Sequence, residues 1–138
     1  MKKIIFFASL ALAAAGCVET AGTRVTIDTD TGSASVLECS TRLASRVRVN
    51  RVTYGETELG LKRATVTLES KTHQRQDLQA RMVWSDREGS DIDADGKPFR
   101  SIVLDGNDVT TFTGVAPNPR AVTARLQLRE TETAQNLY

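Results

Sequence analysis

The stretch Ala64–Asp86, ATVTLESKTHQRQDLQARMVWSD, contains two runs in which apolar and polar residues alternate. A period of two places the apolar side chains of each run on one face of a β-strand. The chain's only tryptophan, Trp84, ends the second apolar row, where its large ring can anchor a core. We therefore predict a central antiparallel pair of strands. The polar connection Lys71–Asp77 contains no Gly or Pro, and it also suits a surface loop or a crossover between two sheets.

Shorter alternating runs lie on both sides of this stretch. Within residues 47–54 the apolar residues change parity, which predicts a β-bulge near Asn50 or Arg51. A single helical turn is expected at Thr41–Ser45. Further strands are predicted at Phe99–Leu104, Val109–Val115 and Val122–Leu128. About six short strands without a long helical pattern predict an antiparallel β-sandwich.

The composition fits one folded domain. The 138 residues are 40% hydrophobic and 25% charged, which is enough to bury a core without disulfides or metals. Without Lys2 and Lys3, which we expect to be removed, 18 − 2 = 16 basic and 17 acidic side chains remain, a net charge of −1. Nucleic-acid binding requires a concentrated basic surface, so we expect no nucleic-acid partner.

Residues 1–16 have the features of an export signal peptide. A short basic region precedes the apolar run Ile4–Ala15, which is shorter than the ~20 residues that span a bilayer. The segment ends in Ala14-Ala15-Gly16-Cys17, which resembles the lipobox of bacterial lipoproteins, although Ala14 replaces the more usual Leu. Small side chains let a peptidase reach the bond, and a thiol can accept a diacylglyceryl group as a thioether. The alternative is an ordinary secretory signal in which Cys17 is incidental.

This resemblance predicts a lipid anchor. Cys17 would become the mature N-terminus and carry several acyl chains, which hold a protein on a membrane durably. Val18 follows it instead of an Asp that would resemble an inner-membrane retention signal, so we expect an outer-membrane anchor facing the periplasm. Cys39 would then be the only remaining thiol. We expect it to be unpaired and either buried or available for an intermolecular bridge.

The composition also predicts where the folded domain begins and ends. Residues 17–35 are rich in Thr, Ser, Gly and Asp, so we predict the lipidated cysteine and a flexible tether there, with at most a short edge strand at Val25 and Ile27. The β-sandwich domain is expected at residues 36–130. The tail, residues 131–138, is expected to be frayed.

Several motifs along the predicted domain resemble those of a known family. They are Arg42–Val49 (RLASRVRV), Trp84-Ser85-Asp86 with Gly89 beyond it, Val115-Ala116-Pro117, and Ala124–Arg129 (ARLQLR). Together they resemble the YcfL-like family of small Gram-negative periplasmic lipoproteins, over roughly Val36–Glu130. Two positions differ: Ser70 stands where the family tends to have Asn, and Phe99 where a second Trp is usual.

The resemblance sharpens the expected fold and the expected place in the cell. It implies an all-β, antiparallel immunoglobulin-like β-sandwich of about six to seven strands. It also implies a domain tethered to the cell envelope with no established activity. Some members resemble neighbours of a lipoprotein that activates a peptidoglycan synthase, which suggests a link to cell-wall synthesis or maintenance.

The residue types that carry catalysis form no recognisable constellation. His73 is the only histidine, which excludes a His-rich zinc site, and it lies in a polar loop without a nucleophile motif. Gly55, Gly60 and Gly89 each stand alone, so no phosphate-binding loop is present. We therefore expect a non-enzymatic protein without a resident cofactor.

One acidic run is a candidate calcium site. Asp91, Asp93 and Asp95 alternate and are followed by Gly96, as in the first half of a calcium-binding loop. The second half does not match, because Ile102 stands where a bidentate Glu is required. A calcium site of another kind and a solvated acidic loop without metal are the two alternatives.

A cluster of arginines is a candidate binding surface. Arg46 and Arg48 are predicted on the strand face opposite Val47 and Val49, where they could meet anionic lipid or wall polymer. The alternative is that these side chains cover the solvent face of a strand and protect a sheet edge.

The sequence therefore predicts a lipid-anchored envelope protein that works by binding. We expect a non-enzymatic adaptor that contacts an unidentified envelope protein or cell-wall component, through loops or an unpaired strand edge. The alternative is a calcium- or peptidoglycan-binding envelope module.

Overall fold

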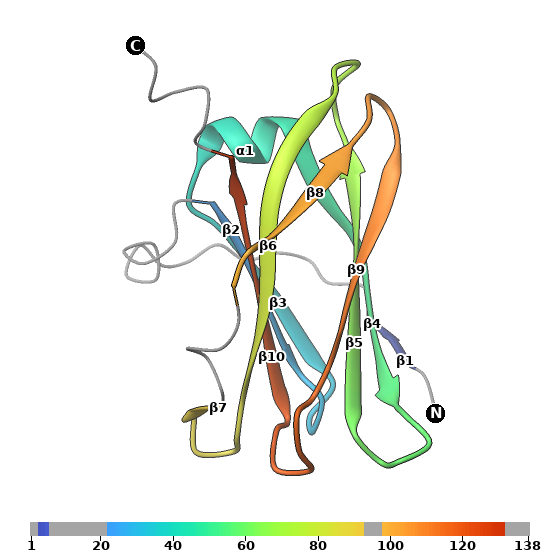
Figure 1. Cartoon of the computed structure of the whole chain (residues 1–138), viewed down its shortest axis with the longest axis vertical. Helices are drawn as coiled ribbons and strands as arrows, with labels where there is room; N and C mark the ends of the chain where they lie inside the picture. Colours follow the sequence, from blue (N-terminus) through green and yellow to red (C-terminus); the bar gives the residue numbers. More distant parts are fainter. Residues whose placement is uncertain (1–2, 6–21, 93–97, 132–138) are drawn as a thin grey trace.

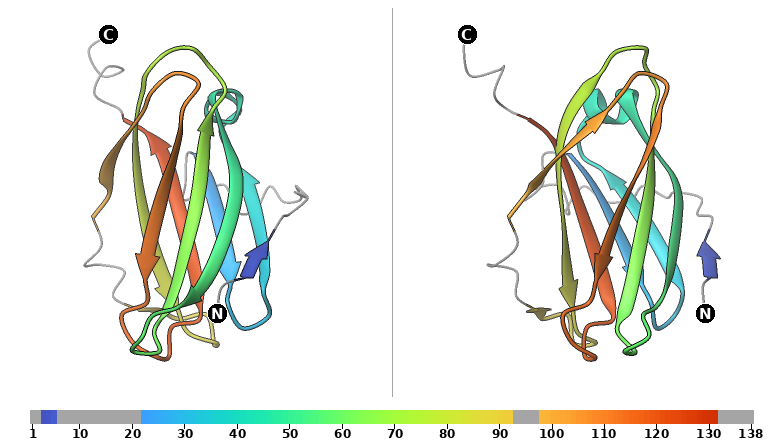
Figure 2. Two further views of the ribbon diagram at one scale, coloured as in Figure 1. Left: turned by 90° about the vertical axis from the view of Figure 1, so that its right-hand side faces the viewer. Right: turned by 45° about the vertical axis from the view of Figure 1, so that its right-hand side comes forward.

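Two antiparallel sheets packed face to face make up the protein, which we describe from a computed structural model (Figures 1 and 2). The structure describes residues 3–5, 22–92 and 98–131. Sheet A has the order β1 (Lys3–Ile5), β4 (Val47–Glu56), β5 (Lys62–Ser70), β9 (Val109–Val115). Sheet B has the order β3 (Ser33–Glu38), β2 (Thr23–Asp28), β10 (Thr123–Glu130), β6 (Gln76–Ser85), with β7 (Asp91–Ile92) and β8 (Arg100–Leu104) pairing with β6. The predicted antiparallel β-sandwich is confirmed.

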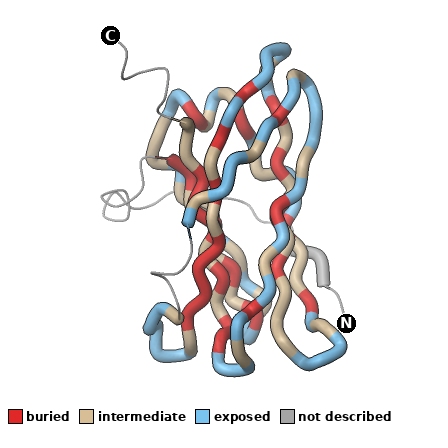
Figure 3. Tube along the Cα trace, viewed as in Figure 1, coloured by how far each residue is buried: buried red, intermediate tan, exposed pale blue. Residues whose placement is uncertain are grey.

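The two strands of the Ala64–Asp86 stretch lie in different sheets. β5 pairs with β4 and β9, whereas β6 pairs with β10, β7 and β8. The predicted central pair is therefore wrong, and the connection between the strands is a crossover from one sheet to the other. Alternation identifies the buried face of a strand but not its neighbour. Each strand is central in its own sheet, and the apolar residues of both strands are buried in the core (Figure 3).

Two local predictions around β4 are confirmed. The register between β4 and β5 shifts between Val49 and Arg51, as a bulge at this point requires. The helical turn is α1 (Thr41–Arg46), and its N-cap residue Ser40 accepts a hydrogen bond from the Leu43 amide at 3.2 Å. Leu43 is fully buried, so α1 closes one end of the core.

The predicted tether contains two strands. Val25 and Ile27 on β2 are fully buried, and β2 pairs with β10 on one side and with β3 on the other. The Thr29 hydroxyl donates a hydrogen bond of 2.6 Å to the carbonyl of Val122, which fixes the end of this hairpin. A flexible tether is therefore wrong for residues 23–35. Main-chain pairing on both sides lets a strand with only two large apolar residues belong to the sheet.

The connections at the α1 end of the sandwich pack against each other. The Asn107 amide, between β8 and β9, donates a hydrogen bond of 2.8 Å to the carbonyl of Thr72, between β5 and β6. A Cβ on Gly106 would lie 2.1 Å from the carbonyl oxygen of His73. This contact fixes the start of β9 relative to β6. Within the described part of the chain, no helix has the length and apolar character that crossing a membrane requires.

Candidate functional site

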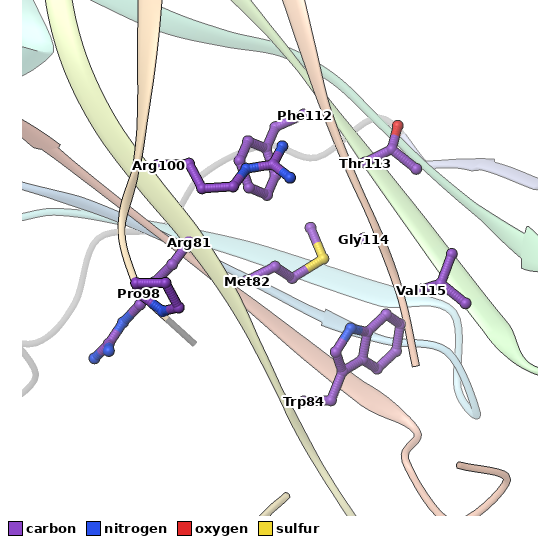
Figure 4. Close-up of a pocket in the computed structure, with 9 residues that line it drawn as sticks. All are labelled: Arg81, Met82, Trp84, Pro98, Arg100, Phe112, Thr113, Gly114 and Val115. Carbon is purple, nitrogen blue, oxygen red and sulfur yellow. The ribbon is translucent and has the colours of Figure 1, made fainter. Parts of the chain in front are cut away.

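A cavity of about 280 Å³ opens between the two sheets, where β9 of sheet A passes β6 of sheet B (Figure 4). Its lining comes from three segments of chain: β6, the start of β8 with the residues before it, and β9. The residues are Arg81, Met82, Trp84, Pro98, Arg100, Phe112, Thr113, Gly114 and Val115. We call this cavity the inter-sheet pocket.

The pocket has an apolar floor and a charged rim. Met82, Trp84 and Phe112 are buried, and their side chains face one another in the close-up view (Figure 4). The Arg100 guanidinium lies over the Phe112 ring, 4.9 Å from its centroid, and covers one end of the pocket. Arg100 forms no ion pair within the described residues. The site therefore suits an apolar group that lies beside a negative charge.

Gly114 lets β9 pass close to Met82 on β6. A Cβ at this position would lie 2.5 Å from the Met82 sulfur and 3.2 Å from the Met82 Cβ. β9 can therefore approach β6 only because residue 114 has no side chain. An isolated Gly inside an alternating strand was the one sequence signal that pointed to this close approach.

The edge of sheet B is interrupted beside the pocket. β7 and β8 pair with the same strand, through Trp84↔Ile92 and Ala80↔Arg100. The seven residues 93–99 thus correspond to only the three residues 81–83 of β6. An insertion in an edge strand therefore separates β7 from β8, and it contains most of the candidate calcium run.

The structure does not assemble the candidate calcium site. Asp91 forms an ion pair with Arg125 on β10, with a nitrogen–oxygen distance of 3.0 Å. Asp93 and Asp95 lie outside the described residues. No group of three potential metal ligands occurs in residues 3–5, 22–92 and 98–131. Calcium binding here stays a prediction of the sequence.

The two arginines predicted to form a basic face have separate surroundings. Arg46 is the last residue of α1 and pairs with Glu130 on β10 at 3.3 Å. Arg48 lies on β4 and pairs with Glu69 on β5 at 2.8 Å. Each arginine thus pairs with a carboxylate of a different sheet, and Arg46 lies on α1 and not on the predicted strand. Binding through these two side chains stays a prediction of the sequence. The alternation pattern extended the strand through Arg46, where the chain is still helical.

His73 has a structural contact. Its Nδ1 accepts a hydrogen bond of 2.7 Å from the side-chain amide of Asn107, in the contact between the two connections. Among the residues that the structure describes, two carboxyl groups have a lowered pKa, Asp30 through the hydrogen bond from Arg87 and Glu56 through the hydrogen bond from Lys62. Both belong to exposed ion pairs away from the pocket, so these shifts do not mark an acid–base site.

Cys39 is half-buried and disulfide-bonded in this structure, which therefore does not contain the expected unpaired thiol. The chain has one other cysteine, Cys17, which lies outside the described residues. One sulfur atom cannot belong to both a disulfide and a thioether. Lipidation of Cys17 and a bond between the two cysteines are therefore alternative states of the chain.

The fold and the pocket define an antiparallel β-sandwich with an inter-sheet cavity at one side. Residues 33–130 match the family model described as "Protein of unknown function (DUF1425)", and the chain belongs to this family. β2 lies before the matched region.

Two solved structures are similar to this chain. A DUF1425 family member from Shewanella sp. pv-4 has 34% sequence identity and a TM-score of 0.56, over 62% of this chain and 78% of that one. Campylobacter jejuni cj0090 has 17% identity and a TM-score of 0.53, over 60% of this chain and 85% of that one, a likeness of fold alone. No curated protein matches the chain significantly.

Proposed function

We propose that the chain is a lipid-anchored protein of the outer membrane that faces the periplasm and acts as a non-enzymatic binding or adaptor module. Membership of DUF1425 supports the resemblance to the YcfL-like lipoproteins, and with it a link to cell-wall synthesis or maintenance. The observation that carries the binding function is the inter-sheet pocket, a cavity with a buried apolar floor and an arginine at its rim.

The pocket lies at the small end of the range of small-molecule sites, a size that a single protein side chain can fill. Small-molecule sites usually enclose about 300–1,000 Å³, and this pocket has about 280 Å³. The only histidine of the chain lies in the contact with Asn107, not in the pocket. A partner could insert an apolar side chain against the apolar floor and place a carboxylate next to Arg100 at the rim.

The anchor is tested on chain purified from membranes. Mass spectrometry is expected to show an N-terminal Cys17 with acyl groups and a Cys39 thiol that can be alkylated. A Cys17→Ala chain is expected to leave the membrane fraction. A wild-type mass without acyl groups, combined with a Cys39 that cannot be alkylated until the chain is reduced, would reject the anchor.

The binding function is tested by cross-linking in native membranes with two matched variants. Val115 and Val109 are both exposed valines of β9, at 41% and 46%, and only Val115 lines the pocket. We expect wild type and Val109→Glu to recover the same envelope protein and Val115→Glu to lose it. Equal recovery of the envelope protein by all three chains would show that it does not bind at the pocket.

A second candidate function, binding of wall polymer, has its own observation. On the outer face of sheet A, Thr53, Thr65 and Thr113 form a row across three strands, and the Thr65 and Thr113 hydroxyls lie 3.0 Å apart. With Arg63 they line a hollow of about 200 Å³. Hydroxyls and a guanidinium suit a glycan that carries carboxylates.

Co-sedimentation with purified peptidoglycan tests this candidate. Arg63→Ala is expected to weaken sedimentation, whereas charge reversal at Arg46 and Arg48, which are already ion-paired, is expected to leave it unchanged. Loss of sedimentation in the Arg46 and Arg48 variant alone would favour the basic face instead.

A further inference from the structure

The outer edge of β9 has free main-chain groups. The Ala116 amide donates to the Lys62 carbonyl at 2.8 Å, and the Ser70 amide donates to the Asp108 carbonyl at 2.9 Å. In an antiparallel ladder, hydrogen-bonded pairs occur at every second residue. The even-numbered residues of β9 therefore bond to β5. The amides and carbonyls of Thr111, Thr113 and Val115 point away from it, and among the described strands β9 has no other neighbour.

This edge has none of the usual protection against pairing. β9 reads VTTFTGV, without a charged residue or a proline. Its register with β5 runs without a shift from Glu69↔Val109 to Arg63↔Val115. Natural proteins usually protect a long, regular edge with charges, prolines or bulges, because it is a template for another strand.

The inter-sheet pocket lies directly beneath this edge. Phe112 and Gly114 line the pocket from the inner side of β9. A strand added to β9 would direct every second side chain to the same inner side. The residue opposite Gly114 would then point toward the pocket that Met82, Trp84 and Phe112 line.

We infer that an extended segment of a partner protein adds to the free edge of β9 as a new strand of sheet A and inserts an apolar side chain into the inter-sheet pocket. An acidic residue near that side chain pairs with Arg100. Strand addition combines main-chain hydrogen bonds, which give affinity, with a side-chain pocket, which gives specificity. The inference rests on the proposed binding function and names the form of its partner.

A random peptide library displayed on phage, panned on the full chain purified from membranes, tests the inference. We expect enriched peptides in which an apolar and an acidic residue stand two positions apart, so that both side chains point to the inner side of β9. Thr111→Pro removes an amide at the free edge and leaves the bonds to β5 intact, so it should weaken their binding about tenfold or more. Thr111→Ala keeps the amide and should bind as wild type does.

Hydrogen exchange gives a second readout that needs no variant. The peptides should protect the amides of Thr111 and Thr113 and leave those of Val52–Tyr54 on β4 unchanged. Enrichment of no peptide with this two-residue spacing, or protection at another surface, overturns strand addition. If Val115→Glu loses the envelope partner and Thr111→Pro recovers it as wild type does, strand addition is rejected and the binding function is retained.

Discussion

The two edges of sheet A have opposite designs. β4, which becomes an edge strand once residues 1–16 with β1 are removed as proposed, carries Arg48 and Arg51 and a bulge between Val49 and Arg51. β9 is regular, uncharged and unpaired on its outer side among the described strands. Charges and bulges are how natural sheets prevent unwanted pairing. The contrast indicates that β4 is kept from foreign strands and that β9 is left open to one.

The largest loss of stability is expected at Gly106, where the contact between two connections fixes the start of β9. Gly106→Ala places a Cβ against the main chain of His73, which cannot move aside cheaply, so we expect a loss of about 2–3 kcal/mol in the free energy of unfolding. Urea denaturation measures it. Gly60→Ala, in the turn beside β4, meets open space but has φ +81°, so about 1 kcal/mol is expected. Equal losses would mean that the contact between the connections does not hold β9.

The next effect concerns the pocket under the open edge. Gly114→Ala forces the Met82 sulfur to move, and because this is the far end of a flexible side chain we expect a loss of about 1–2 kcal/mol. The smaller pocket should also bind the partner segment less well. Thr111→Ala, on the same strand but outside the pocket lining, serves as the control. An unchanged urea midpoint for Gly114→Ala would show that β9 can shift away from β6.

Exchanging the protection of the two edges should change association more than stability. Thr111→Lys puts a charge on β9 and should reduce partner binding while unfolding changes by less than about 0.5 kcal/mol. Arg51→Thr removes a charge from β4 and should increase self-association of purified chain, measured by light scattering. If neither variant changes association, the arginines of β4 serve another purpose.

The sequence predicted what depends on one strand and missed what depends on its neighbours. Alternation located β5, β6, β9 and the bulge in β4, because each strand buries one face whatever lies beside it. The pairing of β5 with β9 was not predictable from alternation, which is the same for either neighbour. β2 was missed because its two apolar residues are too few to signal a strand, and main-chain pairing with β3 and β10 supplies the rest.

The candidate site was harder to predict for the same reason. Met82, Trp84 and Phe112 read as ordinary core residues, and they line a pocket only because β9 passes β6 at Gly114 without pairing with it. The arginines that the sequence singled out, Arg46 and Arg48, are matched by carboxylates from distant parts of the chain. Such matches depend on tertiary structure, which local spacing does not encode.

The smallest expected effect is a change in melting temperature at the β2–β3 hairpin of sheet B. Arg87 holds Asp30, in the turn of this hairpin, at 2.7 Å, and the hydrogen bond lowers the pKa of Asp30 below its ordinary value of 3.8. A lowered carboxyl pKa stabilises the fold at pH values above the unfolded-state value, and the stabilisation is lost as the pH falls through the folded-state value. Asp30→Asn should therefore melt slightly below wild type at pH 7, and the two melting temperatures should converge as the pH falls below 3.8. Asp105→Asn, in an exposed turn without an ion pair among the described residues, should match wild type throughout. A difference for Asp30→Asn that persists in acid would show that hydrogen bonding within the turn, and not the Arg87 pair, fixes this hairpin.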